Sequence, residues 1–316
     1  MRAAPPEPEA LITRLGTIAA DAGWARPEHD AVSQGPRRER LGALASHSPH
    51  ALRVAAAADG LVLAAQHQAL DGLSMLAALS RLLGQPVRSA ARGVDKAGRP
   101  SGGAAALLGR AWEVGARPQA VVAPGRVGRA QGDALASTTV DGEHRTADLV
   151  HAGARAVAAW NVRRGATARR ISVAVGVSTV GGASQDLADN SAFLRLRDVE
   201  QLSLDAVRQE LAHAPLQPGG GDVAHRPVVA AAGRLAQRLA APRLGSTLLV
   251  SHLGRVDVPE DVSELAFYPV TGGGSGLSLG AATTRGRTTL TLRARASHHD
   301  DEGLQQFLAL VAEMLV

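Results

Sequence analysis

The sequence contains no cysteine, which excludes disulfide bonds, thiolate metal ligands and a cysteine nucleophile. Aromatic residues are scarce, at 2% of the chain, so few rings are available for nucleic-acid bases to stack on. Lysine occurs once, as Lys96, and scattered arginines supply the other positive charges behind the net charge of +5. We interpret these arginines as a solvated surface and predict no nucleic-acid partner. A mildly positive surface would still favour an anionic cofactor or an acidic carrier protein.

Long hydrophobic runs are absent too. No apolar segment is long enough to cross a bilayer, and residues 1–10, with their prolines and acidic residues, lack the apolar core of a signal peptide. We therefore expect a cytoplasmic protein without a membrane partner. Of the 316 residues, 45% are hydrophobic and 20% are charged, which is ordinary for a folded chain with room for two lobes.

Hydrophobic periodicity predicts a mixed α/β fold whose sheets carry helices on a face. We divide the chain into a flexible tail at 1–9, an N-terminal lobe at 10–100, a crossover region at 101–143 and a C-terminal lobe at 144–316. Residues 25–41 are expected to be a loop or a short helix. Strands are predicted at 51–56, 61–65, 135–140, 171–180, 192–196, 247–253, 265–270, 277–283 and 288–296. Helices are predicted at 10–22, 73–83, 104–114, 146–162, 204–213, 228–239 and 301–315, with Thr146 as one N-cap.

The most informative stretch is Leu61–Leu83, LVLAAQHQALDGLSMLAALSRLL. Asp59-Gly60 lies between two apolar runs and predicts a hairpin that leads into this stretch. The polar residues 66–68 end the second apolar run, and Asp71 precedes leucines at helical spacing. His67 and Asp71 are therefore held where a core strand ends. That position suits acid–base chemistry, and it equally suits a loop histidine with an aspartate that caps the next helix.

Other patterns indicate structure rather than chemistry. Residues 276–280, GLSLG, match G-x-S-x-G, but β-like sequence follows where a nucleophile elbow requires a helix. Residues 298–301, HHDD, contain metal-ligand types, yet they lie between a strand and the last helix, where aspartates act as caps. We therefore predict no metal ion. The glycines at 219–221 and 272–274 do not match a phosphate-binding motif.

Residues 66–72, QHQALDG, contain the pattern H-x-x-x-D-G, with the hairpin before it and the helix after it. Downstream follow the helical residues 144–164, the strand ISVAVGVSTV at 171–180, DNSAF at 189–193 and SHLGRV at 251–256. This series resembles the condensation-domain and HxxxD acyltransferase superfamily. That superfamily includes the condensation domains of nonribosomal peptide synthetases, wax ester synthases, polyketide-associated acyltransferases and chloramphenicol acetyltransferase. The likeness covers about residues 50–316.

The resemblance implies an α/β protein of two chloramphenicol-acetyltransferase-like lobes, each a mixed sheet with helices packed on it, and a tunnel between the lobes. Because only 66 residues precede His67, the N-terminal lobe is expected to be reduced. The Asp-Phe-Gly-Trp-Gly motif of several branches is absent.

The resemblance also implies roles for individual residues. His67 would be the general base of acyl transfer, and Asp71 would support it by fixing the turn and the imidazole. The backbone N–H of Gly72 and the hydroxyl of Ser251 are candidates for stabilising the oxyanion. Gln66, which replaces the first histidine of the family motif, is a further candidate for this role or for lining the tunnel.

This sequence departs from the family at one charged position. An arginine often pairs with the aspartate of the motif, and Ser178 or Thr179 stands at that place here. Asp71 is therefore expected to act through backbone N–H groups at the start of the following helix.

The implied function is transfer of an acyl or aminoacyl group from a thioester to an amine or hydroxyl acceptor, in natural-product biosynthesis. The co-substrate would be acyl-CoA or a phosphopantetheinyl carrier protein, with no tightly bound cofactor. The partners would be a small-molecule acceptor and an acyl or peptidyl carrier protein. Two alternatives stay open: a catalytically silent condensation-like protein that binds a carrier protein or another partner, and an epimerase or cyclising enzyme on the same scaffold.

Overall fold

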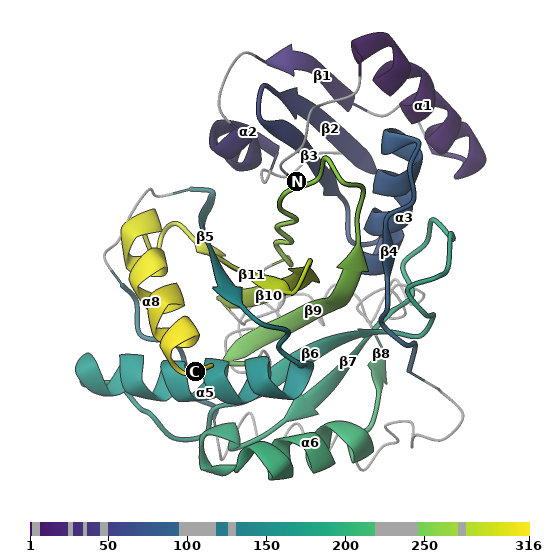
Figure 1. Ribbon diagram of the computed structural model, residues 1–316. Coiled ribbons are helices and arrows are strands. Elements are labelled where there is room, and N and C mark those ends of the chain that lie inside the picture. Colours follow the sequence, from purple (N-terminus) through teal and green to yellow (C-terminus); the bar gives the residue numbers. More distant parts are fainter. Residues whose placement is uncertain are drawn as a thin grey trace, which may run out of the picture.

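The computed structural model describes residues 1, 7–24, 28–33, 37–44, 50–94, 118–125, 131–218, 246–270 and 276–316. They form a smaller N-terminal lobe and a larger C-terminal lobe, each built around its own β-sheet (Figure 1). The mixed α/β fold predicted from the sequence is confirmed. The helices predicted at 104–114 and 228–239 lie outside the described residues.

The N-terminal lobe is a three-stranded sheet with helices beside it. Its elements are α1 (Pro8–Asp21), β1 (Glu28–Ser33), α2 (Arg37–Leu44), β2 (Leu52–Ala57), β3 (Gly60–Ala65) and α3 (Gly72–Leu83). β1 runs parallel to β2, and β2 runs antiparallel to β3 across the predicted Asp59-Gly60 turn. The strand β1 was not predicted, because the segment at 25–41 was expected to be a loop or a short helix.

Of the residues predicted as a tail at 1–9, Met1 lies buried, with its amino group donating a hydrogen bond to Leu61 O at 3.1 Å. Residues 2–6 lie outside the described residues, and Pro8 and Glu9 belong to α1.

The helix α3 begins and ends where the sequence predicts. Asp71 is its N-cap and accepts a hydrogen bond from Ser74 N at 2.7 Å. Gly84 closes the helix in the left-handed region at φ 67°. The buried leucines of α3 pack against α1 and the other apolar residues of this lobe, and burial of each leucine stabilises the fold by about 1.5–3 kcal/mol. The motif turn that precedes α3 is therefore fixed to the core of the lobe.

The C-terminal lobe holds the remaining elements. They are β4 (Arg88–Ser89), β5 (Asp133–Asp141), α5 (Thr146–Arg163), β6 (Val173–Ser178), β7 (Ser191–Leu196), the 3₁₀ helix η1 (Val199–Gln201), α6 (Leu204–His213), β8 (Gln217–Pro218), β9 (Leu248–Asp257), β10 (Leu277–Thr284), β11 (Arg287–Arg295) and α8 (Asp301–Glu313). The part of the chain predicted as a crossover at 101–143 thus contributes β5 to the large sheet, where it pairs with β11.

The strand β9 connects the two lobes. The large sheet has the order β5-β11-β10-β9-β6-β7-β8, and β9 runs parallel to both of its neighbours. Beyond this pairing, the end of β9 pairs antiparallel with β4. Leu253 and Val256, near that end, belong to the apolar cluster of the N-terminal lobe. The C-terminal sheet therefore reaches the core of the other lobe.

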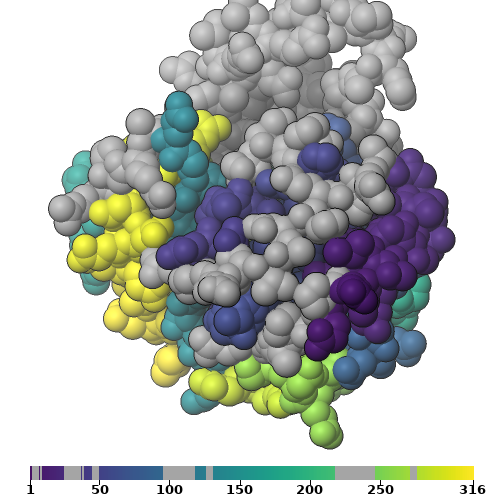
Figure 2. All heavy atoms as spheres, turned by 90° about the horizontal axis from the view of Figure 1, so that it is seen from above, coloured from purple at the N-terminus to yellow at the C-terminus, as the bar shows by residue number. Residues whose placement is uncertain are grey.

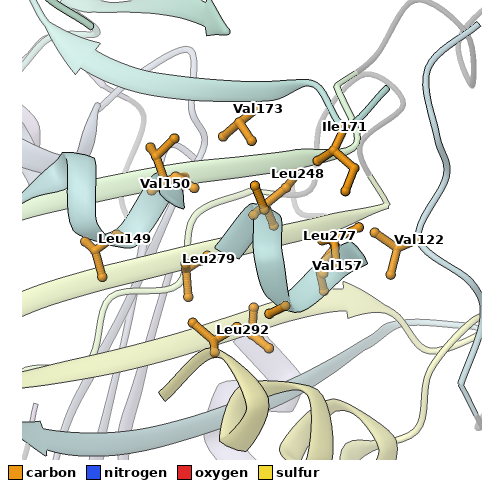
Figure 3. Close-up of a cluster of buried hydrophobic side chains, with 14 of the residues drawn as sticks. Val122, Leu149, Val150, Val157, Ile171, Val173, Leu248, Leu277, Leu279 and Leu292 are labelled. Carbon is orange, nitrogen blue, oxygen red and sulfur yellow. The ribbon is translucent and has the colours of Figure 1, made fainter. Parts of the chain in front are cut away.

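The main core lies between this sheet and the helices α5 and α8. Figure 3 shows leucines and valines of α5 meeting those of β6, β9, β10 and β11. Gly153 lets α5 approach the sheet closely, because a Cβ atom there would lie 2.7 Å from Leu248 Cδ2. Seen from above, residues near the N-terminus, in purple, and α8, in yellow, lie on opposite sides of the molecule (Figure 2).

Two helix starts test the capping predictions. Asp300 caps α8 and accepts from Gly303 N at 2.7 Å, as predicted for the HHDD segment. The prediction of Thr146 as the N-cap of α5 is wrong. Arg145 is the N-cap, because its backbone N–H donates to the Asp148 carboxylate at 2.8 Å, and Thr146 is the first helical residue.

The prediction of a strand at 265–270 is also wrong, because these residues form no regular secondary structure. Their carbonyl groups accept from side chains of neighbouring strands, Phe267 O from Thr291 Oγ1 and Pro269 O from Ser278 Oγ. Pro269 has no N–H to give to a strand ladder. Ser278 itself lies fully buried within β10, so the predicted exclusion of a nucleophile elbow is confirmed.

Candidate active site

His67 lies in the tight turn between β3 and α3. The carbonyl oxygen of Gln66 accepts from Ala69 N at 2.9 Å and from Leu70 N at 3.1 Å, which closes this turn. The turn leaves the His67 side chain 35% exposed, at the boundary between the lobes. A histidine in this setting is reachable by a ligand and is held by a fixed backbone.

The imidazole of His67 has one polar partner among the described residues, and it comes from the other lobe. Nδ1 lies 3.3 Å from Asp189 Oδ2. The side chain of Asp189 is 23% exposed, and its other carboxylate oxygen accepts from Ser191 N at 3.0 Å. Asp189 belongs to the DNSAF stretch of the family resemblance, but the sequence predicts no contact between it and His67. The two residues stand 122 positions apart, and no local pattern indicates that they meet.

Asp71 lies beside this pair but has a different environment. It is 4% exposed, and Oδ1 accepts from Ser74 N at 2.7 Å. Oδ2 accepts from Ser178 Oγ at 3.1 Å and from Asn190 N at 3.2 Å. Three hydrogen bonds satisfy the carboxylate without an arginine, because the hydroxyl of Ser178 supplies one of them. The predicted bond to the helix N-terminus is present.

The expectation that Asp71 also fixes the imidazole is not met in the described structure, where Asp71 makes no hydrogen bond with His67. Its carboxylate instead joins the start of α3 to β6 and to the chain before β7. Asp71 is therefore a structural support of the turn and not a hydrogen-bond partner of His67.

The backbone of the C-terminal lobe strengthens the same junction. Ala188 O accepts from Ser74 Oγ at 2.6 Å and from Asp71 N at 3.4 Å. Together with Asp189 and Asn190, this residue forms a segment in which every member bonds to the motif region. We call residues 188–190 the inter-lobe clasp.

A cavity of about 1190 Å³ lies between the lobes, and residues of both lobes line it. Such a volume is large for a site that binds small molecules. The lining includes every site residue predicted from the sequence, namely Gln66, His67, Asp71, Gly72 and Ser251. Leucines of β3 and α3 supply much of its apolar surface.

The three remaining candidates line this cavity in different ways. Gly72 starts α3 against the side chains of Leu253 and Phe267, and a Cβ atom at Gly72 would lie 2.8 Å from Leu253 Cδ2. Ser251 lies on β9 beside Gly176 of β6, and its hydroxyl has no hydrogen-bond partner among the described residues. Gln66 is partly buried at the start of the motif turn.

A second histidine of the cavity lining, His252, has a different electrostatic setting. Its Nδ1 lies 3.2 Å from Thr146 Oγ1, and its Nε2 is buried without a partner among the described residues. Burial lowers the pKa of His252 to about 4, so the imidazole is neutral at pH 7. His299, beside Trp160 and the N-terminus of α8, behaves alike, because burial lowers its pKa to about 4.

Within the described ranges, no group of three or more His, Cys, Asp or Glu side chains is placed to bind a metal ion. Among the helices of those ranges, none is both long and apolar enough to span a bilayer.

No protein-family model and no curated protein matches the sequence. Solved structures do match. The first condensation domain of the calcium-dependent antibiotic synthetase, bound to a substrate analogue, shares 18% identity at a TM-score of 0.52, and the match covers 99% of this chain and 90% of that one. A variant of the starter condensation domain of rhizomide synthetase, in complex with C8-CoA and Leu-SNAC, shares 14% at 0.53, covering 99% and 86%. The chain has the same fold as these condensation domains.

A cyclization domain is similar as well. The cyclization–docking bidomain of the EpoB nonribosomal peptide synthetase from Sorangium cellulosum shares 10% identity at a TM-score of 0.53, and the match covers 99% of this chain and 78% of that one. Condensation and cyclization domains share this fold, so the fold alone does not distinguish between their reactions. The reaction has to be argued from the residues of the cavity.

Proposed function

We propose that the protein transfers an acyl or aminoacyl group from a thioester to an amine or hydroxyl acceptor, with His67 as the general base. The observation that carries this proposal is the partly exposed imidazole of His67 at the inter-lobe cavity, held at Nδ1 by a carboxylate. This is the arrangement of a base and its orienting group that nucleophilic acyl transfer uses.

The reaction would proceed in two steps. The acceptor attacks the thioester carbonyl while His67 Nε2 takes the proton of the acceptor, which gives a tetrahedral oxyanion and an imidazolium. The oxyanion then collapses, the carbon–sulfur bond breaks, and the imidazolium returns the proton to the departing thiolate. General-base catalysis of this kind contributes about 10²–10⁴-fold to the rate. Ser251 Oγ and the N–H of Gly72 remain our candidates for stabilising the oxyanion.

The donor would be acyl-CoA or an acyl or peptidyl carrier protein that bears phosphopantetheine, and the acceptor would be a small molecule. Neither donor is a tightly bound cofactor, since both are consumed as co-substrates. Two features support this choice. The cavity of about 1190 Å³ is large enough for an acyl chain and an acceptor together, and a structure of the same fold holds C8-CoA and Leu-SNAC. A role in natural-product biosynthesis would follow from such substrates.

A second candidate is an epimerase or cyclising enzyme, in which His67 removes a proton from carbon. The observation behind the cyclising reaction is the fold that the chain shares with the EpoB cyclization domain. Acyl transfer is preferred because the cavity volume of about 1190 Å³ leaves room for a donor and an acceptor together. A condensation-like protein that only binds a carrier protein is the remaining possibility.

The test is acceptor-dependent thiol release, measured with acetyl-CoA, octanoyl-CoA and an aminoacyl-SNAC against a panel of amines and alcohols. A thiol-reactive dye reports the reaction without background from the protein, because the chain has no cysteine. We expect thiol release that requires both enzyme and acceptor. Deuterium uptake at the substrate α-carbon without thiol release would establish the second candidate instead. Absence of both, with an acyl carrier protein still binding, would establish the silent binding protein.

A further inference from the structure

The inter-lobe clasp, residues 188–190, divides its contacts between support and orientation. Its first and last residues bond to Asp71 and Ser74, which fixes the backbone of the clasp against the start of α3. The middle residue, Asp189, faces His67 Nδ1 at 3.3 Å. The carboxylate is thus held in place from both sides, and its distance to the imidazole is set by the junction between the lobes.

This contact determines which nitrogen of His67 carries the proton. An ionised carboxylate has no proton to donate, so the hydrogen bond requires that Nδ1 donates. A neutral imidazole carries one N–H, so the lone pair that can accept a proton is then on Nε2. The tautomer of a histidine is commonly set in this way by the hydrogen bond of the other ring nitrogen.

Asp71 cannot perform this task, because its two oxygens already accept from Ser74 N, Ser178 Oγ and Asn190 N. We propose that Asp189, rather than the aspartate of the motif, is the positioning residue that holds His67 in the Nδ1–H tautomer. The effect on catalysis rests on the proposed function of His67, whereas the effect on the tautomer does not.

The carboxylate would also act during the reaction. When Nε2 takes the proton of the acceptor, His67 becomes an imidazolium, and the negative charge of Asp189 stabilises it. The proton stays on the imidazole and returns to the leaving thiolate, so Asp189 neither gains nor loses a proton.

The substitution Asp189→Asn separates this role from simple support. Asp189 Oδ1 accepts from Ser191 N at 3.0 Å, and an asparagine that keeps this bond places its NH₂ group where Oδ2 now faces His67. An NH₂ group donates, so Nδ1 would have to accept, and the proton would move to Nε2. The shape is conserved while the tautomer is reversed. Asp189→Ala, in contrast, removes the carboxylate that contacts Nδ1 and puts no donor in its place.

This gives an order of activities that a structural role would not produce. In serine proteases, the analogous aspartate-to-asparagine exchange lowers kcat by about 10⁴. The pair here is partly exposed, so we expect roughly a 100-fold loss in turnover for Asp189→Asn and roughly a 10-fold loss for Asp189→Ala. If Asp189 only supported the loop, the isosteric asparagine would be the milder change. The control is Asp186→Asn, which removes an exposed carboxylate of the same loop that bonds to Ser184 and not to His67.

The deciding experiment is nitrogen-15 NMR of the histidine rings at about pH 8, above the ordinary histidine pKa of about 6.5. The His67 signal is assigned by its loss in His67→Ala. We expect the Nδ1–H tautomer in the unmodified protein and in Asp186→Asn, and the Nε2–H tautomer in Asp189→Asn. An Nε2–H tautomer in the unmodified protein overturns the proposal, as does an unchanged tautomer in Asp189→Asn. Because this readout needs no substrate, absence of thiol release would reject the acyltransfer function and leave the positioning role tested separately.

Discussion

Two aspartates meet at the motif turn. Asp71 belongs to the turn itself and Asp189 comes from the C-terminal lobe, and they differ in burial and in hydrogen-bond partners. Asp71 is buried and accepts three hydrogen bonds, whereas Asp189 is an exposed residue whose carboxylate faces His67. The buried aspartate bonds to groups of both lobes, and the exposed one contacts the imidazole of His67. The aspartate of the sequence motif therefore joins the two lobes, and the carboxylate that contacts His67 lies outside the motif.

Replacement of Asp71 should have the largest effect on stability. Asp71→Ala removes the N-cap of α3 and takes away the acceptor of the Ser178 hydroxyl and of Asn190 N–H, so we expect a loss of about 3 kcal/mol in the free energy of unfolding. Urea denaturation measures it. Ser178→Ala removes one of these bonds and should cost about 1 kcal/mol. If Asp71→Ala were as stable as Asp186→Ala, which removes an exposed carboxylate, the supporting role would be refuted.

The histidines show the same contrast between buried and exposed groups. Burial lowers the pKa of His252 and His299 to about 4, so the folded protein keeps them neutral while the unfolded chain takes up protons below pH 6.5. Their stabilisation is present above about pH 6.5 and is lost as the pH falls towards 4. Each of these two histidines should lower the free energy of unfolding by about 1–2 kcal/mol as the pH falls from 7 to 5.

Urea denaturation at these two pH values checks the histidine effect. His299→Gln should reduce the difference between them by the share of one histidine, and the exposed His213 provides the control, since His213→Gln should leave the difference unchanged. A stability that is constant from pH 7 to pH 5 would contradict the burial argument.

Gly72 gives a smaller effect at the same turn. A Cβ atom there would lie 2.8 Å from Leu253 Cδ2 and 3.0 Å from Phe267 Cζ, so Gly72→Ala should destabilise the protein by about 1–2 kcal/mol through overpacking between the lobes. The matched control is Gly16→Ala in α1, where nothing lies within 4 Å of the new atom. That change should stabilise the protein by about 0.5–1 kcal/mol, because alanine favours a helix. Melting curves distinguish the two, and equal signs would contradict the close contact at Gly72.

Local signals predicted much of the fold and half of the site. The Asp59-Gly60 turn, the cap at Asp71 and the cap at Asp300 each depend on a few adjacent residues, and each is present. By contrast, β1 pairs in parallel with β2, a strand further along the chain. The largely polar sequence at 28–33 does not predict a strand. The strand predicted at 265–270 is the opposite error. Apolar residues of this segment pack into the core, but two of its carbonyl groups accept hydrogen bonds from side chains.

The missed part of the site is non-local for the same reason. The turn 66–72 identified His67 and Asp71, and helix capping explained the position of the aspartate. Asp189 lies in a loop whose sequence does not predict a contact with His67. The contact forms only because the two lobes pack against each other. The sequence likewise shows only that Ser178 or Thr179 stands where the family often has an arginine. The hydrogen bond from the Ser178 hydroxyl to Asp71 depends on the contact between the lobes.

The most direct measurement of the central claim compares thiol release by the unmodified protein, His67→Ala and His213→Ala at a saturating acyl thioester, together with their melting temperatures. We expect His67→Ala to lower turnover by about 10²–10⁴-fold with an unchanged melting temperature, because the base is lost while the partly exposed side chain contributes little to stability. His213→Ala should retain full turnover. An unchanged rate in His67→Ala would contradict the account.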